Sequence, residues 1–243
     1  CPYGMPGMVF QQGDDGKSII KKIITDKDYI TDIPNLFIHG QITQLSEMYF
    51  AKGPYTSIQV LFKPQALYVL FGMDASKITN GSLQAKDFSG LHLNEQLLHA
   101  RNDDERIKLL NDFLKDKLAQ GKNPDSIIDE SLSVIHDTIK TVTVGSLLEQ
   151  IHLSERQFER RFMQVVGLPP QLYIRIKRFD EAMRLVDSGQ YERLTDIATA
   201  LHYYDQSHFI RDIKLFSGVT PKSISQKVGD FSHDKVVASY FQP

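Results

Sequence analysis

The C-terminal half of this 243-residue chain contains an internal repeat, and this repeat limits the possible folds more than any other feature of the sequence. Apolar, cationic, glycine and proline positions recur at an offset of 51 residues, and a further set before them recurs at an offset of 50. The pairs at 51 are Phe158 with Phe209, Arg160 with Arg211, Phe162 with Ile213, Gly167 with Gly218 and Pro170 with Pro221; those at 50 are Val144 with Leu194, Leu147 with Ile197, Ile151 with Leu201 and His152 with His202. Since the offset changes between His152 and Phe158, one copy has an extra residue where a turn between two helices can absorb it.

Each copy has the same predicted layout: a short amphipathic helix, a tight turn, and a second helix that ends at glycine and is soon followed by proline. The first copy has helices at 144–150 and 155–166, and the second has helices at 195–201 and 205–217. The segment 171–186 joins the copies, and its apolar residues form one stripe at helical spacing. The stripe consists of Leu172, Ile176, Phe179, Met183 and Val186. We therefore predict two helix-turn-helix units joined by one helix.

The second helix of each copy has an apolar row, which predicts its buried face. Phe158, Phe162 and Val165 form this row in the first copy, and Phe209, Ile213 and Phe216 form it in the second. The remaining faces carry groups that match base edges, since arginine suits guanine, glutamine suits adenine and glutamate accepts from cytosine. These outward residues are Arg156, Glu159, Arg160 and Met163 in the first copy, and Gln206, Ser207, Ile210, Arg211 and Lys214 in the second.

The distribution of charge favours a nucleic-acid partner only locally. The net charge of the chain is -2, which argues for no particular partner. Residues 155–178 contain six arginine and lysine residues against two glutamates, so we expect this segment to favour a phosphate surface. We also expect helices that begin at Ser154 and Thr195 to offer free backbone N–H groups to phosphate oxygens.

Two motifs resemble the AraC-type (arabinose-regulator) family of bacterial transcription factors. The second copy carries Asp-Gln-Ser-His-Phe-Ile-Arg-Asp-Ile-Lys at 205–214 and Phe-Ser-Gly-Val-Thr-Pro at 216–221, and the first carries Ser-Glu-Arg-Gln-Phe-Glu-Arg-Arg-Phe at 154–162. The resemblance covers about residues 127–225. It implies seven helices, with recognition helices 155–166 and 205–217 in successive major grooves on one face of the duplex. It also implies that Arg156, Glu159 and Arg160 face bases in one groove, that Gln206, Ser207 and Arg211 face bases in the other, and that Lys214 contacts a phosphate.

The sequence departs from the family pattern at four positions. His152 and His202 stand in the turns where the family has glycine, and histidine adopts a positive φ less readily. Leu148 stands where the family has a small residue, whereas the corresponding residue of the second copy, Ala198, is small. Ile213 stands where phenylalanine is usual. We therefore expect the packing of the first unit to differ most from that of the family.

The first 90 residues have short β-favouring runs between glycines and prolines, which predicts a β-rich domain. We expect strands at 8–11, 18–24, 36–38 and 57–62, a helix at 64–71, and helices across 91–118. This region resembles a cupin-like sensory domain. The predicted fold class is α+β, with a β-rich cupin-like N-terminal domain followed by an all-α domain with two helix-turn-helix units. The expected domains are 1–120, whose helical end is 91–120, then 125–227, and a tail at 228–243.

From these features we expect a regulator that binds double-stranded DNA and is not an enzyme. We expect its β-rich part to sense a small-molecule effector or to form a homodimer, and a shift between the parts to change DNA affinity or contact with RNA polymerase. The alternatives are a small-molecule-binding or enzymatic β-barrel with a helical protein-interaction module, which a pocket of converging acid, base or metal-ligand groups in 1–90 would favour.

The remaining expectations concern metals, cofactors and compartment. The eight histidines show no metal-ligand spacing and no catalytic motif is found, so we expect no catalytic residue, no metal and no cofactor. Cys1 is the single cysteine, which excludes disulfide frameworks within the chain. Without an apolar run of membrane-spanning length we expect no membrane partner and a cytoplasmic location, with a lipid anchor on Cys1 as the alternative.

Overall fold

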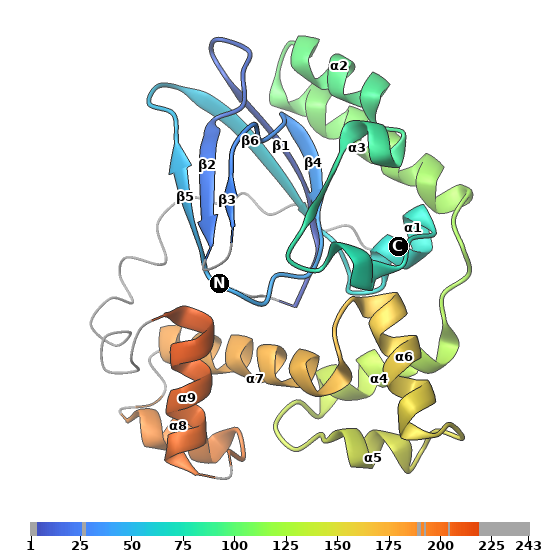
Figure 1. Cartoon of the computed structure of the whole chain (residues 1–243), viewed down its shortest axis with the longest axis vertical. Helices are drawn as coiled ribbons and strands as arrows, with labels where there is room; N and C mark the ends of the chain where they lie inside the picture. The colour runs from blue at the N-terminus through green and yellow to red at the C-terminus, as the bar shows by residue number, and fades with distance from the viewer. Residues whose placement is uncertain (1–3, 26–27, 189–190, 192, 204, 219–243) are drawn as a thin grey trace.

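The computed structural model describes residues 4–25, 28–188, 191, 193–203 and 205–218. Its N-terminal part contains two antiparallel sheets. One sheet has the order β6 (Tyr55–Leu61), β1 (Gly7–Gly13), β4 (Leu36–His39) and β7 (Ser82–Gln84). The other has the order β3 (Tyr29–Ile30), β2 (Ile20–Thr25) and β5 (Ser46–Phe50). Figure 1 shows these sheets above a helical part.

The central strands of the first sheet bury both of their faces, because side chains alternate across a strand. Met8 and Phe10 of β1 pack in a core that also contains Leu93, Leu97 and Leu110 of the helices α2 and α3. Val9 and Phe37 point into a separate, smaller core with Ile19, Ile20 and Ile33. Helices cover one side of the sheet, and the second sheet lies toward the other.

Helical segments of different lengths lie between β6 and the helical part, and β7 interrupts them. They are α1 (Ala66–Phe71), η1 (Ala75–Ile78), η2 (Ala85–Phe88), α2 (Leu91–His99) and α3 (Asp103–Ala119). The structure agrees with the predicted strands at 8–11, 18–24, 36–38 and 57–62 to within two residues, and with the predicted helices across 64–71 and 91–118. It adds β3, β5 and β7, which the sequence analysis missed. In β5 the burial pattern does not alternate, so period-2 patterning could not identify that strand.

The helical part comprises α4 (Ser126–Asp137), α5 (Val144–Leu148), α6 (Glu155–Val166), α7 (Pro170–Asp187), α8 (Leu194–Ala200) and α9 (Gln206–Ser217). Helix α6 has both predicted ends. Helix α5 ends two residues before its predicted end, and α9 begins one residue after its predicted start, since Asp205 is its N-cap. The seventh helix implied by the resemblance and the predicted tail at 228–243 lie outside the described residues.

Helix α7 is buried on more than one side, which corrects the prediction of a single apolar stripe. Ile176 and Phe179 are fully buried as predicted, but Tyr173, Ala182 and Leu185 are buried too. The remaining members of the stripe, Leu172, Met183 and Val186, are only partly buried. Both helix-turn-helix units pack on α7, so its apolar surface is wider than the face that a helix on one core would need.

The β-rich part touches the ends of two helices of the helical part. Gly167, which ends α6, accepts a hydrogen bond from the Thr79 hydroxyl through its carbonyl oxygen, and a Cβ built on it would lie 3.0 Å from the Ala75 carbonyl oxygen. Gly218, which ends α9, lies so close to Leu45 that a Cβ built on it would be 2.5 Å from Leu45 Cδ1. Tyr68 of α1 packs against the helical core. The two parts are therefore in direct contact at both glycine caps.

Within the described residues, the N-terminal and C-terminal parts have separate hydrophobic cores. The N-terminal core reaches Leu110 of α3, and the C-terminal core begins at Ile128 of α4. The predicted boundary at 120–125 lies between them and stays a prediction, as does cupin-like closure of the sheets. None of the described helices is both long and apolar enough to cross a bilayer.

Candidate nucleic-acid interface

Helix α6 has well-defined caps at both ends. Ser154 and Gln157 form a capping box, in which the Ser154 backbone N–H donates to Gln157 Oε1 at 3.0 Å and the Gln157 N–H donates to Ser154 Oγ at 3.4 Å. At the other end Gly167 adopts φ +92°, which closes the helix in the left-handed region. These caps fix where α6 starts and ends, and the burial of Phe158 and Phe162 decides which of its faces is exposed.

Helix α9 is capped in a similar way. The Asp205 carboxylate accepts the His208 backbone N–H at 2.6 Å, and Gly218 ends the helix with φ +72°. The predicted phosphate-binding N-terminus at Ser154 coincides with the start of α6. The predicted start at Thr195 is wrong, because Arg193 is the N-cap of α8 and Thr195 lies within its first turn.

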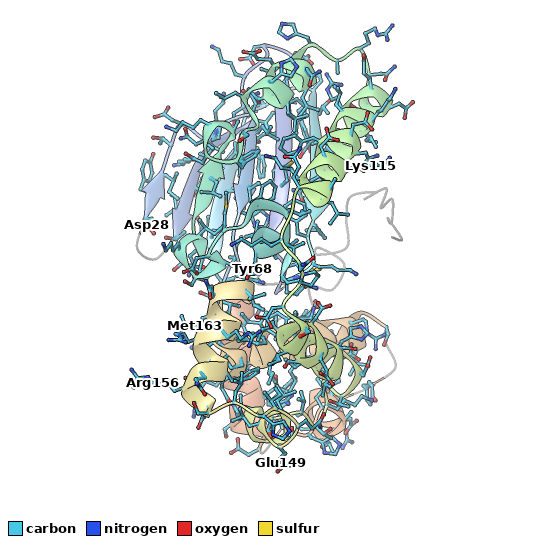
Figure 2. All side chains as sticks on the ribbon, turned by 90° about the vertical axis from the view of Figure 1, so that its right-hand side faces the viewer. Asp28, Tyr68, Lys115, Glu149, Arg156 and Met163 are labelled. Atoms are coloured by element: carbon cyan, nitrogen blue, oxygen red, sulfur yellow. The ribbon has the colours of Figure 1, made fainter. Side chains whose placement is uncertain are left out.

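The exposed side chains of α6 and α9 form two rows on each helix. Within a row the residues are four positions apart, and the rows of one helix correspond to those of the other. Positions four residues apart are neighbours on a helix surface. In α6 the rows are Glu155, Glu159 and Met163, and Arg156, Arg160 and Gln164; in α9 they are Gln206, Ile210 and Lys214, and Ser207, Arg211 and Leu215. All seven residues predicted to contact DNA are exposed: Arg156, Glu159, Arg160, Gln206, Ser207, Arg211 and Lys214. Figure 2 shows Arg156 and Met163 on the outer side of α6.

Helix α7 sets the separation between the two units. In Figure 1 it lies across the helical part, with α6 at one end and α9 at the other, and both of these helices run in the same direction. Its 18 residues span about 27 Å. Successive major grooves on one face of B-DNA are about 34 Å apart, a separation that this helix and the widths of its neighbours can bridge.

Most cations of the segment 155–178 have partners within the protein, which narrows the predicted phosphate surface. Arg161 pairs with Asp125, Arg175 with Asp212, and Lys177 with Asp180. Arg178 donates to the carbonyl oxygens of Ile139 at 3.2 Å and Val142 at 2.9 Å. Within the part of the chain that the structure describes, Arg156 and Arg160 are the cations of this segment for which no such bond is found. Three of the six cations, Arg161, Arg175 and Arg178, therefore join elements of the protein to one another.

The Arg175–Asp212 pair joins α7 to α9, and sequence reasoning did not identify it. Arg175 Nη2 lies 2.6 Å from Asp212 Oδ1, and Asp212 is only 1% exposed. Hydrogen bonding to Asp212 raises the pKa of Arg175 above its ordinary value. The Arg175 guanidinium also lies over the Phe216 ring at 5.7 Å. The available signal was position: Asp212 follows Phe209 by three residues, so it lies on the face of α9 that turns inward.

A second cluster joins α7 to the turn of the second unit. Tyr203 packs edge-on against His208 and Phe209, with ring centroids 5.6 Å and 5.2 Å apart. Arg178 lies over the Tyr203 ring at 5.9 Å, while burial lowers the pKa of Arg178 and raises that of Tyr203. Through Arg178, the loop after α4 is connected to the turn before α9.

The two histidine turns solve the same problem differently. His202 adopts φ +51°, in the left-handed region. The family has glycine at this turn position, and glycine adopts that region readily. His152 is not among the described residues with positive φ. The second copy has one residue more than the first between its histidine and its buried phenylalanine, and we attribute the difference in backbone conformation to this extra residue.

Comparisons with known proteins support the same architecture. Residues 147–227 match a family described as a helix-turn-helix domain, and residues 1–84 match a domain of unknown function (DUF6597). A search of curated proteins gave no match. Among solved structures, ToxT from Vibrio cholerae O395 bound to (E)-4-(8-methylnaphthalen-1-yl)but-3-enoic acid has a TM-score of 0.53 and 12% identity, covering 93% of this chain and 92% of that chain. Another ToxT structure has a TM-score of 0.52 and 13% identity, covering 95% and 91%. The predicted α+β fold class is confirmed.

Proposed function

Because this chain belongs to the AraC family of DNA-binding transcription regulators, we propose that it binds a specific duplex site with α6 and α9 in successive major grooves. One observation carries this proposal: the two helices present matched exposed rows, while their apolar rows are fully buried in one core. A helix-turn-helix protein inserts its second helix into the major groove, where the exposed side chains reach base edges.

The chemistry of the rows assigns a role to each residue. Arg156, Arg160 and Arg211 each match the O6 and N7 acceptors of guanine, and Gln206 matches adenine. Glu159 accepts from the cytosine amino group, and Ser207 suits either a donor or an acceptor. Lys214, nearer the C-terminal end of α9, contacts a phosphate, which gives affinity without sequence preference.

The test begins with selection of bound sites from random duplex DNA by the full chain. The Arg211→Ala variant is then titrated against the selected site at several salt concentrations. We expect a loss of about 1–3 kcal/mol and relaxed preference at one base pair. Arg101→Ala removes an exposed guanidinium, 86% exposed, from the β-rich part and serves as the matched control, which should bind as the wild type does.

Two results would contradict the proposal. One is selection that enriches no common site. The other is an Arg211→Ala variant with unchanged affinity and preference. A binding constant that does not fall with added salt would instead favour a helical module that binds protein, because phosphate contacts make DNA binding weaken steeply with salt.

We also propose that a small molecule bound to the β-rich part changes the placement of the recognition helices. The contacts of Gly167 with η1 and of Gly218 with Leu45 support a physical connection, and one similar ToxT structure holds an aryl-substituted carboxylic acid. Aryl-substituted butenoic acids are therefore a first panel to titrate against the full chain and its DNA complex. A ligand that shifts the thermal midpoint of the protein should also shift its affinity for DNA.

A further inference from the structure

Helix α9 exposes an isoleucine within its row of polar groups. Ile210 is 39% exposed and belongs to none of the cores of the described residues. Its neighbours one turn away in either direction are Gln206 and Lys214, and Arg211 follows it directly. An apolar side chain is therefore surrounded by the groups that we expect to meet DNA.

Helix stability does not account for isoleucine at this position. Its β-branched side chain loses rotamer freedom in a helix, so an unbranched polar residue would suit a solvent-exposed site better. Contact with an apolar group outside the protein would offset this cost by removing the exposed surface from water. In the major groove of DNA, the apolar group at the base edges is the 5-methyl group of thymine.

We infer that Ile210 contacts the 5-methyl group of one thymine in the bound site, and so contributes to base preference. This inference rests on the proposed function. Ile210 is the fifth residue of α9, and the N-terminal residues of a recognition helix are those that reach base edges. The methyl contact complements the hydrogen bonds of Gln206 and Arg211, since neither of these groups reads a methyl.

The same helix provides a matched control. Leu215 is 50% exposed, more than Ile210, and lies five residues further along α9. This offset places it about 7.5 Å farther from the N-terminal end. If exposure of an apolar residue were sufficient, Leu215 would behave as Ile210 does. If proximity to the bases decides, only Ile210 responds to the methyl group.

The experiment replaces each thymine of the selected site, one at a time, by uracil, which lacks the 5-methyl group but still pairs with adenine. The wild type, Ile210→Ala and Leu215→Ala are titrated against every duplex. We expect one thymine whose replacement weakens wild-type binding about fourfold, the effect of exposing one methyl-sized group. At this position Ile210→Ala should bind the thymine and uracil duplexes equally, and Leu215→Ala should keep the wild-type difference.

The possible failures are distinguishable. A wild type that binds no specific site contradicts the proposed function itself. A wild type that binds its site but shows the same response to uracil as Ile210→Ala, at every position, overturns this inference alone. Circular dichroism and thermal unfolding check that both variants keep the fold, which we expect because both side chains are exposed.

Discussion

At the scale of single residues, the buried side chains of α6 and α9 are all apolar except that of Asp212. The periodicity of the sequence predicts the buried rows of α6 and α9 correctly, including Phe158, Phe162, Phe209 and Phe216. It could not predict that an aspartate lies 1% exposed beside them, because a charged residue is buried only when a distant partner meets it. That partner, Arg175, lies 37 residues away on α7, and no local pattern relates the two positions.

We predict that Asp212→Ala destabilises the protein by about 2–4 kcal/mol, because it leaves a partly buried guanidinium without its carboxylate. Urea unfolding of the full chain, monitored by circular dichroism, measures the change. Asp196→Ala on α8 is the matched control, since Asp196 is exposed, and it should shift the free energy of unfolding by no more than about 0.5 kcal/mol. Equal effects of the two substitutions would show that the Arg175–Asp212 pair contributes nothing.

At the scale of elements, the ends of the helices were more predictable than their surroundings. The Ser154 cap and the two glycines give clear local signals, so the bounds of α6 were predicted correctly. The width of the buried surface of α7 depends on two units packing against it, which is a tertiary property. Likewise, histidine occupies the matched position of both turns, yet only His202 has a positive φ, so residue type alone does not decide this backbone conformation.

Replacing the glycine that ends α6 by alanine should lower the stability of the protein, whereas the same replacement within α5, the control, should raise it. Gly167→Ala forces a side chain into φ +92° and places its Cβ close to the Ala75 carbonyl, so we expect a loss of about 1–3 kcal/mol. Gly145→Ala, within α5, meets only Thr143 Oγ1 at 3.7 Å and should stabilise the protein by about 0.5–1 kcal/mol. Thermal unfolding of both variants is the measurement, and stabilisation by Gly167→Ala would contradict the strained cap.

At the scale of the whole molecule, the contact between the two parts could not be predicted from the sequence. The fold class and the order of the helices follow from patterns within each half. The residues that join the halves, such as Thr79 and Leu45, lie in short connecting segments without a distinctive motif. Contacts of this kind depend on how two finished surfaces fit, and a periodic pattern contains no information about that fit.

We predict that Thr79→Val weakens the contact between the parts, because valine keeps the shape of threonine but cannot donate to the Gly167 carbonyl. The expected loss is about 0.5–1.5 kcal/mol in the free energy of unfolding. Thr56→Val in β6 is the control, since β-branched residues suit strands. Protease digestion should cut the 120–125 connection of Thr79→Val faster than that of the control, and equal rates would count against this role for Thr79.

The contacts of the two glycine caps with the β-rich part mean that a small movement at a cap is enlarged at the far end of its helix. Helix α6 is 12 residues long, about 18 Å, so a tilt of about 5° at Gly167 moves its far end by about 1.5 Å. A displacement of that size breaks a hydrogen bond to a base. The β-rich part contacts the C-terminal ends of both α6 and α9, so a small shift at these contacts moves the exposed rows of the two helices relative to each other.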